Sequence, residues 1–321
     1  MFVESFKITG SAVIQIFLLG ALGYFLTKKN ILGEEGLNII SRLTLDITLP
    51  FLIFSQLIKD FSFSSYANWW AFPLLSIAVT ILALTVGYVF SWFIKGSQHK
   101  AQFLSLVGFQ NSGYLPLALI AALLPPELAA PVFIYLFLFL FGFNLVMFSL
   151  GVYILAHSKE KKFELVSLFS PPVIACILGL AGVFFGLPKV IPDMVLNPLR
   201  MIGDCTLPLA MLVVGGSLAS MRLKHIDIKA MIYLALAKLV VLPLIGLWFV
   251  LSYHLPHLVA LLIILQLAAP PATTLSVIVR HYKKEDLLVS QGIFFGHILS
   301  LITIPIFLSI YFMLVMIKLV K

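Results

Sequence analysis

The chain has 321 residues, of which 61% are hydrophobic and only 11% are charged, and its mean hydropathy is +1.11. Soluble domains carry about 25% charged residues, so this composition excludes an ordinary soluble protein. The net charge of +8 arises from basic residues in short loops that build no continuous basic face, which argues against nucleic acid as a partner.

The first apolar run follows "MFVESFKITG", which contains both Glu4 and Lys7, and no small-residue cleavage site follows it. It therefore predicts a membrane span and not a cleaved signal peptide. Further apolar runs long enough to cross a bilayer follow along the chain. The ten predicted spans are 8–27, 37–58, 67–94, 101–124, 128–156, 165–187, 194–220, 228–253, 257–279 and 287–317. These spans predict an all-α polytopic protein embedded in a lipid bilayer.

Basic residues are divided unequally between the two ends of these spans. One side has five, namely Lys7, Lys59, Lys189, Lys318 and Lys321. The other side has thirteen, namely Lys28, Lys29, Lys95, Lys100, Lys159, Lys161, Lys162, Arg222, Lys224, Lys229, Arg280, Lys283 and Lys284. The positive-inside rule predicts a multi-pass protein of the cytoplasmic (plasma or inner) membrane with both termini outside the cytoplasm.

The most polar connection, "HSKEKKFE", follows the fifth span. It divides the chain into a five-helix repeat at 1–157, a short cytoplasmic linker at 158–164 and a second five-helix repeat at 165–321. Because each half has an odd number of spans, homologous halves must be inverted repeats. "RLTLDITLP" in span two and "RMIGDCTLP" in span seven, 158 residues later, support this interpretation.

The fourth and ninth spans contain residues that weaken a helix. Span four contains "FQNSGYLPLAL", and span nine contains "QLAAPPATTLSV". The same offset of 158 residues superimposes 111–113 on 269–271, so both predicted breaks occupy equivalent positions. Paired broken helices indicate a binding site near the midplane of a transporter. The candidate substrate-binding residues are Gln110, Asn111, Ser112, Gly113, Pro116, Pro270, Pro271, Thr273 and Thr274.

A broken helix leaves unpaired N–H groups at the start of its second half, where the helix dipole is positive. Two such ends near the midplane favour an anion, and a carboxylate is the natural guest. The amide and hydroxyl side chains of both segments add neutral donors. Proline lacks an N–H, so the expected role of Pro270 and Pro271 is geometric.

A few charged residues within the spans are candidates for ion or proton coupling or for structural support. Arg42 and Asp46 share one helix face, as do Arg200 and Asp204. Mutual neutralisation and coupling both remain open for these pairs. Lys238 has three open interpretations, namely structural pairing with a carboxylate, contact with a substrate carboxylate, or snorkelling, and structural pairing is preferred.

His297 is interpreted first as a packed or hydrogen-bonded histidine and second as a proton carrier. "GGS" at 215–217 predicts close helix packing.

The chain resembles the auxin efflux carrier family, which includes plant PIN and PIN-like carriers and bacterial malate and malonate permeases. The motifs that carry the resemblance are "FQNSGYLPLAL", "CTLPLAMLVVGGSLA" and "AAPPATTLSVIVRHYKKEDLLVSQGIFFGHILSLITIPIF". The resemblance implies ten helices in two inverted repeats, crossover helices four and nine, an elevator-like cycle and a homodimer. Two departures concern the substrate: Pro116 follows Asn111 by five residues where many bacterial members have seven, and Thr274 replaces a frequent asparagine.

We therefore expect a secondary transporter for a small organic anion, working by alternating access in the lipid bilayer. One alternative is a sodium-coupled carrier of the bile-acid symporter type, and another is a non-transporting membrane receptor or scaffold. No enzyme signature appears, so an enzyme is not expected. We expect no cofactor and no metal site, while coupling to protons or sodium stays open.

Overall fold

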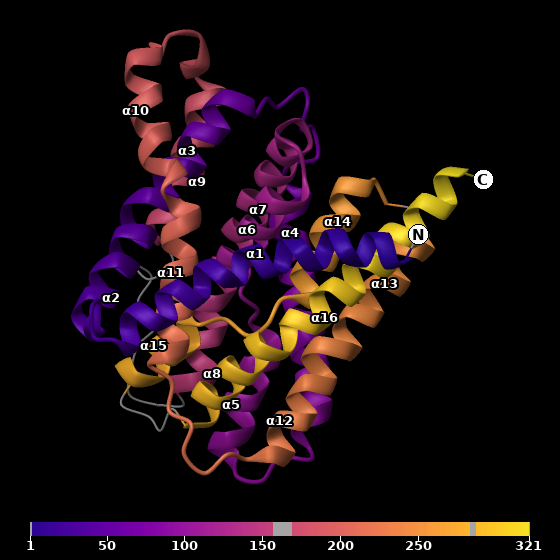
Figure 1. Cartoon of the computed structure of the whole chain (residues 1–321). Helices are drawn as coiled ribbons and strands as arrows, with labels where there is room; N and C mark the ends of the chain where they lie inside the picture. The colour runs from indigo at the N-terminus through magenta and orange to yellow at the C-terminus, as the bar shows by residue number, and fades with distance from the viewer. Residues whose placement is uncertain (1, 157–168, 254, 283–286, 321) are drawn as a thin grey trace.

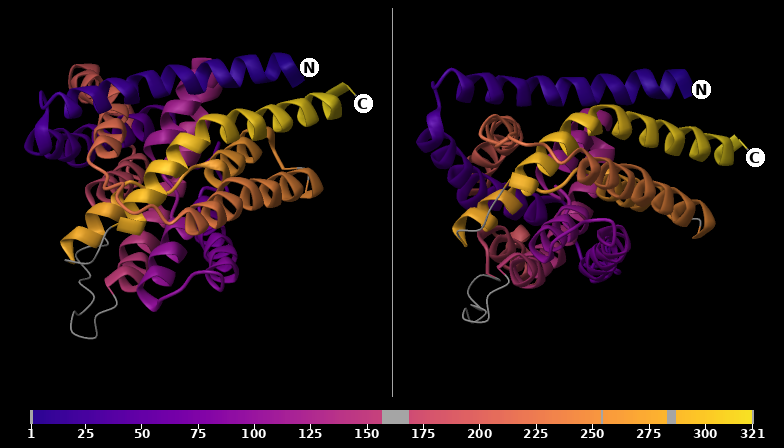
Figure 2. Two further views of the ribbon diagram at one scale, coloured as in Figure 1. Left: turned by 60° about the horizontal axis from the view of Figure 1, so that its bottom comes forward. Right: turned by 90° about the horizontal axis from the view of Figure 1, so that it is seen from below.

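The computed structural model describes residues 2–156, 169–253, 255–282 and 287–320. Within these ranges the chain is helical, apart from turns, loops and one isolated β-bridge. Figure 1 shows the helices gathered into one bundle, and both termini lie at the same end of it in every view (Figures 1 and 2). The linker predicted at 158–164 lies outside the described residues.

The first half of the chain forms helices of very different lengths. They are α1 (Phe2–Lys28), α2 (Gly33–Arg42), the π-helical η1 (Leu43–Thr48), α3 (Leu49–Asp60), α4 (Ala71–Ser91), α5 (Ser97–Gly108), α6 (Tyr114–Leu123), α7 (Pro126–Val146), the π-helical η2 (Met147–Gly151) and α8 (Val152–Ala156). Since α2, η1 and α3 follow one another without a gap, they make one continuous span.

The second half has a similar variety. Its elements are α9 (Pro171–Phe184), the 3₁₀ turn η4 (Leu187–Lys189), α10 (Asp193–Asp204), α11 (Thr206–Ala219), α12 (Ile228–Leu234), the π-helical η5 (Ala235–Val241), α13 (Leu242–Tyr253), α14 (His257–Ala268), α15 (Thr274–His281) and α16 (Leu287–Val320). Asp227 is the N-cap residue of α12. Its side chain accepts a hydrogen bond from the Ala230 N–H, which satisfies one of the free N–H groups in the first turn of the helix.

Seven helices of the described chain are long and apolar enough to cross a membrane. Three predicted spans differ. The sixth, predicted at 165–187, is represented by the 14-residue helix Pro171–Phe184. The fourth and ninth are each divided into two short helices, α5 with α6 and α14 with α15. A polytopic all-α membrane protein is therefore confirmed, while ten membrane crossings in two inverted repeats remain a prediction.

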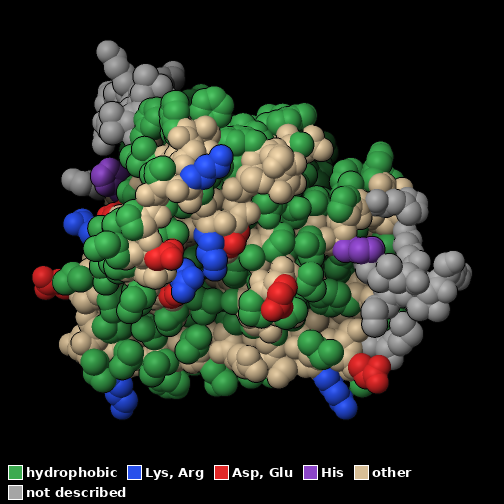
Figure 3. All heavy atoms as spheres, turned by 90° about the horizontal axis from the view of Figure 1, so that it is seen from above, with side chains coloured by type: hydrophobic (Ala, Val, Ile, Leu, Met, Phe, Trp, Pro, Cys, Tyr) green, Lys and Arg blue, Asp and Glu red, His purple; other side chains and the backbone are tan. Residues whose placement is uncertain are grey.

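Many large apolar side chains are exposed on the molecular surface, more than a soluble protein exposes. Leu18, Trp248 and Phe185 have exposed fractions of 64%, 64% and 82%. Figure 3 shows one face covered largely by hydrophobic side chains, with a small group of acidic and basic side chains near its middle. Large exposed apolar areas mark surfaces that contact another apolar phase, and here that phase is the acyl-chain region of a bilayer.

Glycines let α1 and α11 approach until their backbones touch. A Cβ atom added to Gly215 would lie 1.7 Å from the carbonyl oxygen of Gly20, and one added to Gly23 would lie 2.2 Å from that of Leu212. No larger residue fits at these points without separating the helices. The close packing predicted for 215–217 is confirmed.

Candidate functional site

The two interrupted helices break at matching points. Helix α5 ends at Gly108 and α6 begins at Tyr114, while α14 ends at Ala268 and α15 begins at Thr274. Each interruption is therefore five residues long, at 109–113 and at 269–273. We call these two stretches the first and second break.

The two breaks lie against each other and share backbone hydrogen bonds. The Asn111 N–H donates to the Pro270 carbonyl at 2.8 Å, and the Ala272 N–H donates to the Phe109 carbonyl at 2.9 Å. Both breaks are buried, and buried backbone groups need partners wherever water is absent. Each break thus supplies the partners that the other has lost, which explains how two weakened helices persist inside an apolar bundle.

The two breaks give a spacing between the halves that differs by two residues from the motif spacing. The bridge joins Gln110 to Pro271, and α6 and α15 begin at residues 114 and 274, which are 160 apart. The motif offset of 158 had matched Asn111 with Ala269. By helix start, the equivalent of Asn111 is Pro271.

A buried glutamine that sequence analysis did not select braces the first break. Gln266, in the last turn of α14, is 0% exposed. Its Nε2 donates to the Ser112 carbonyl at 3.0 Å, and its Oε1 lies 3.5 Å from the Gln110 Nε2. The signal was present, because Gln266 is a polar residue within an apolar run four positions before Pro270. Its partners 154 and 156 residues away were not predictable from that position.

Two residues of helix α16, His297 and Gly296, contact the two breaks where the breaks lie against each other. His297 is 0% exposed, and its Nε2 lies 3.3 Å from the Asn111 Nδ2. Its Nδ1 lies 2.8 Å from the Ile293 carbonyl oxygen. A Cβ atom on the neighbouring Gly296 would lie 2.6 Å from the Pro271 Cδ, so this position needs glycine. The histidine is buried and hydrogen-bonded, as its first interpretation predicted.

A cavity of about 180 Å³ lies beside the breaks, and its lining combines polar residues of both breaks with apolar residues such as Leu140 and Phe143. We call it the polar cavity. Six of the nine candidate substrate-binding residues line it, namely Gln110, Asn111, Ser112, Gly113, Thr273 and Thr274. The other three, Pro116, Pro270 and Pro271, do not line it. Polar residues that sequence analysis missed also contribute, namely Ser41, Asn144, Ser170 and Ser217, together with Tyr114, which sequence analysis had interpreted as a helix-interface residue. Ser41, Asn144 and Ser217 belong to α2, α7 and α11, and Ser170 precedes α9, so these four lie outside the two helix-breaking segments. Tyr114 is the first residue of α6, directly after the first break.

Both half-helices direct their N-terminal ends at this cavity. Within the described ranges, the N–H groups of Gly113, Tyr114, Thr273 and Thr274 have no hydrogen-bond partner. Buried oxygens of three lining residues, Gln110 Oε1, Ser112 Oγ and Ser170 Oγ, also lack a partner among the described residues. The part of the lining that the structure describes includes no aspartate, glutamate, lysine or arginine. The cavity therefore offers two positive helix ends and neutral polar groups.

The four charged residues of spans two and seven do not line the cavity. Arg42, Asp46, Arg200 and Asp204 are all exposed on the surface of the single chain. No ion pair within Arg42–Asp46 or Arg200–Asp204 is present among the described residues. Asp46 belongs to η1, and its charge acts on the hydroxyl of Tyr114, which lines the cavity.

Lys238 lies in the π-helical segment η5 and is 1% exposed. Its ammonium donates to the Val107 carbonyl at 3.0 Å, one residue before the end of α5. Among the described residues it pairs with no carboxylate and does not line the polar cavity. The preferred pairing with Asp46 or Asp204 is therefore not present. The cation instead lies at the negative end of a half-helix dipole, where the last carbonyls lack intrahelical partners.

Comparison with known proteins places these features in a family. A family model described as "Membrane transport protein" matches residues 9–164 and 155–308. An uncharacterized transporter of Methanothermobacter thermautotrophicus is 26% identical over 300 residues, which cover 92% of this chain and 95% of that protein. Protein PIN-LIKES 7 of Arabidopsis thaliana is 22% identical over 361 aligned positions, with 86% and 89% coverage. An uncharacterized transporter of Methanocaldococcus jannaschii is 27% identical over 219 residues, with 66% and 70% coverage.

Proposed function

The chain belongs to the auxin efflux carrier family of membrane transport proteins, and from this premise we propose that its cargo is a small organic anion, with a carboxylate as the recognised group. It is a transporter and not an enzyme. One observation carries the proposal about cargo. Two half-helix N-termini, at Tyr114 and Thr274, border the same polar cavity.

The chemistry of the cavity fits an anion better than a cation. Positive helix ends and unpartnered N–H groups attract negative charge, and an acidic lining residue that would repel it is not present. Neutral donors from Asn111, Ser112 and Thr273 suit a carrier, because they hold a carboxylate without the tight ion pair that would slow its release. A volume of about 180 Å³ limits the cargo to a small molecule in this conformation.

Alternating access in this fold requires the two breaks and the helices that carry them to move relative to the rest of the bundle. The cavity is lined by Ser41, Ser170 and Ser217, which lie toward the helix ends that adjoin the strongly basic loops. By the positive-inside rule this is the cytoplasmic side, and we propose that the cavity opens inward in this conformation. We propose that α5, α6, α14, α15 and α16 move together in an elevator-like step against α1, α3, α9, α10 and α11.

The exposed charges of spans two and seven support a homodimer. Charged side chains that face lipid at membrane depth are costly, and a second copy of the chain would cover them. The Arg42–Asp46 and Arg200–Asp204 faces are the proposed contact surfaces. Asp46 also stays a proposal for proton or sodium coupling, because its charge reaches Tyr114 at the cavity.

Thermal stabilisation of the purified protein across a panel of mono- and dicarboxylates tests the cargo class, since a ligand that binds only the folded state raises its stability. The panel is repeated with and without sodium and at two pH values to identify a coupling ion. We expect a carboxylate-dependent shift that Asn111→Ala removes and that Pro73→Ala, in the helix α4 away from the cavity, retains.

Uptake of the same carboxylate into liposomes then establishes transport. A well-folded sample that shifts with no anion, or an equal loss in Asn111→Ala and Pro73→Ala, would remove the support for anion binding at the breaks.

A further inference from the structure

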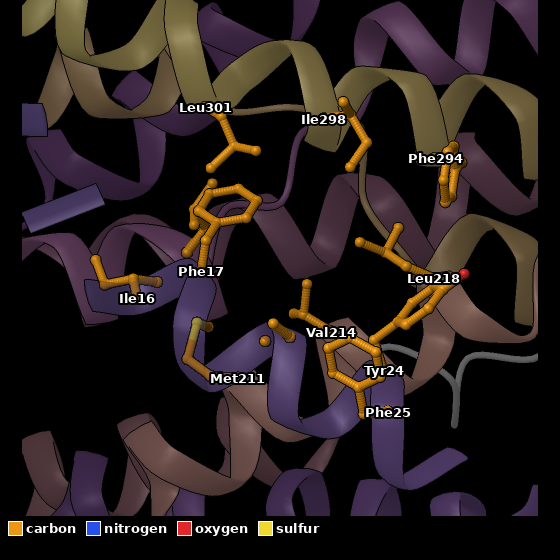
Figure 4. Close-up of a pocket in the computed structure, with 14 residues that line it drawn as sticks. Ile16, Phe17, Tyr24, Phe25, Met211, Val214, Leu218, Phe294, Ile298 and Leu301 are labelled. Carbon is orange, nitrogen blue, oxygen red and sulfur yellow. The ribbon is translucent and has the colours of Figure 1, made fainter. Parts of the chain in front are cut away.

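A second cavity, of about 310 Å³, lies on the opposite side of α11 from the polar one. Its walls come from α1, α6, α11 and α16, and they are almost entirely apolar. Figure 4 shows side chains of α1, α11 and α16 arranged around the hollow, with Ile16 at one end and Tyr24 and Phe25 at the other. Two of the lining residues, Phe25 at 61% and Ile298 at 42%, are exposed, so the cavity reaches the molecular surface.

The size and lining of this cavity favour a flexible hydrocarbon as its occupant. An apolar cavity of ~150 Å³ stays dry and accepts benzene, and this one is about twice as large. It lies along α1, a membrane-spanning helix whose outer face is exposed and apolar. The phase that surrounds this helix therefore consists of lipid acyl chains. The apolar side chains around an empty cavity lack dispersion contacts on one side, and an acyl chain that enters from the bilayer would restore them.

Two basic residues, Lys28 and Lys29, lie beside the Tyr24 end of the cavity. The Lys28 ammonium lies 5.7 Å from the centroid of the Tyr24 ring, and Tyr24 lines the cavity. Lys28 is the last residue of α1, and Lys29 follows it, on the side that the positive-inside rule assigns to the cytoplasm. Basic residues at a membrane surface attract anionic lipid headgroups. We propose that the cavity binds one acyl chain of an anionic glycerophospholipid of the cytoplasmic leaflet, with its phosphate at Lys28.

The bound chain would pack directly behind the polar site. Leu115 of α6 lines the apolar cavity, and its neighbour Tyr114 lines the polar one. On α11, Val214 and Leu218 face the apolar cavity, whereas Val213 and Ser217 face the polar one. The acyl chain therefore braces the half-helix whose N-terminus borders the polar cavity. This lipid site goes beyond the proposed anion transport and does not depend on it.

Photocrosslinking in nanodiscs tests the site. The probe is phosphatidylglycerol with a diazirine in one acyl chain, present as a minor component in phosphatidylcholine, and mass spectrometry locates the labelled residues. We expect labelling to concentrate on 16–25 of α1, 211–218 of α11 and 294–301 of α16. Ala21→Phe fills the cavity and removes this labelling, while the matched change Leu22→Phe, at a 51% exposed position outside the lining, retains it.

The headgroup contact has its own variant, which keeps the test valid if Ala21→Phe does not fold. Lys28→Gln should lower phosphatidylglycerol labelling about fivefold, the contribution of one basic residue near an anionic lipid. Lys7→Gln, at the other end of α1, should leave it unchanged. Labelling that is equally strong on α4 and α9, or that persists in Ala21→Phe, would overturn the proposal. So would labelling by a photoreactive free fatty acid with none by the phospholipid.

Discussion

The Nε2 atom of His297 lies 3.3 Å from the Nδ2 atom of Asn111, although 186 residues separate them in the chain. The other ring nitrogen, Nδ1, lies 2.8 Å from the Ile293 carbonyl oxygen, which can only accept a hydrogen bond. The neutral ring therefore carries its proton on Nδ1, and Nε2 accepts from Asn111. Helix α16 thus sets the orientation of the Asn111 amide, whose second N–H stays free for another acceptor.

His297→Leu should loosen the Asn111 amide at the first break. The change removes a buried acceptor while keeping an apolar side chain of similar size, and an unpaired buried donor costs about 1–3 kcal/mol. We expect a lower unfolding temperature and weaker carboxylate binding. Thermal unfolding with and without ligand measures both. His257→Leu, at the exposed start of α14, is the control, and equal effects of the two changes would contradict the role assigned to His297.

Gly296→Ala should displace Pro271 from its position in the second break. The new Cβ would lie 2.6 Å from the Pro271 Cδ, and overpacking of this kind costs about 1–3 kcal/mol. We expect lower stability and a reduced rate of uptake into liposomes. Gly10→Ala in α1 is the matched change, because a Cβ there meets nothing within 4 Å and alanine favours a helix. Because helix propensity alone would make both changes neutral or stabilising, a loss at Gly10 as large as that at Gly296 would contradict the role assigned to the Pro271 contact.

Gln110 and Gln266 should act as a coupled pair. Gln110→Leu leaves the Gln266 Oε1 atom without its partner, whereas Gln266→Leu leaves the Ser112 carbonyl and the Gln110 Nε2 atom without theirs. A double-mutant cycle of unfolding free energies should give a coupling of about 0.5–3 kcal/mol. Purely additive losses would mean that the 3.5 Å contact between the two side chains contributes nothing measurable to the crossing.

Asn144→Asp should weaken carboxylate binding, because it places a negative charge beside the proposed anionic cargo. Asn144 lines the polar cavity from α7. Two negative charges ~5 Å apart repel by roughly 3 kcal/mol at an effective dielectric constant of ~20, so carboxylate binding should weaken by about 100-fold. Asn144→Leu removes the amide without adding charge and should have a much smaller effect. If the two variants bind carboxylates equally well, the cargo carries no negative charge near this residue.

The sequence by itself determined the environment of this protein and the location of its two helix breaks. Apolar runs of spanning length require a bilayer, and "FQNSGYLPLAL" and "QLAAPPATTLSV" interrupt two of those runs. Both signals are local, because helix length and helix breaking depend on neighbouring residues. Because these local signals locate the breaks and the breaks border the polar cavity, six of the nine residues selected from the two segments line it.

Only the tertiary structure decided which distant groups meet. It joined the breaks by backbone hydrogen bonds, set the starts of α6 and α15 160 residues apart, brought Gln266 and His297 to the first break, and placed Lys238 at the end of α5. It also placed Arg42, Asp46, Arg200 and Asp204 on the exposed surface. Helical periodicity says which residues share a face, but it does not say which helix that face contacts. The partner of each buried polar group is set by how helices far apart in the chain pack together.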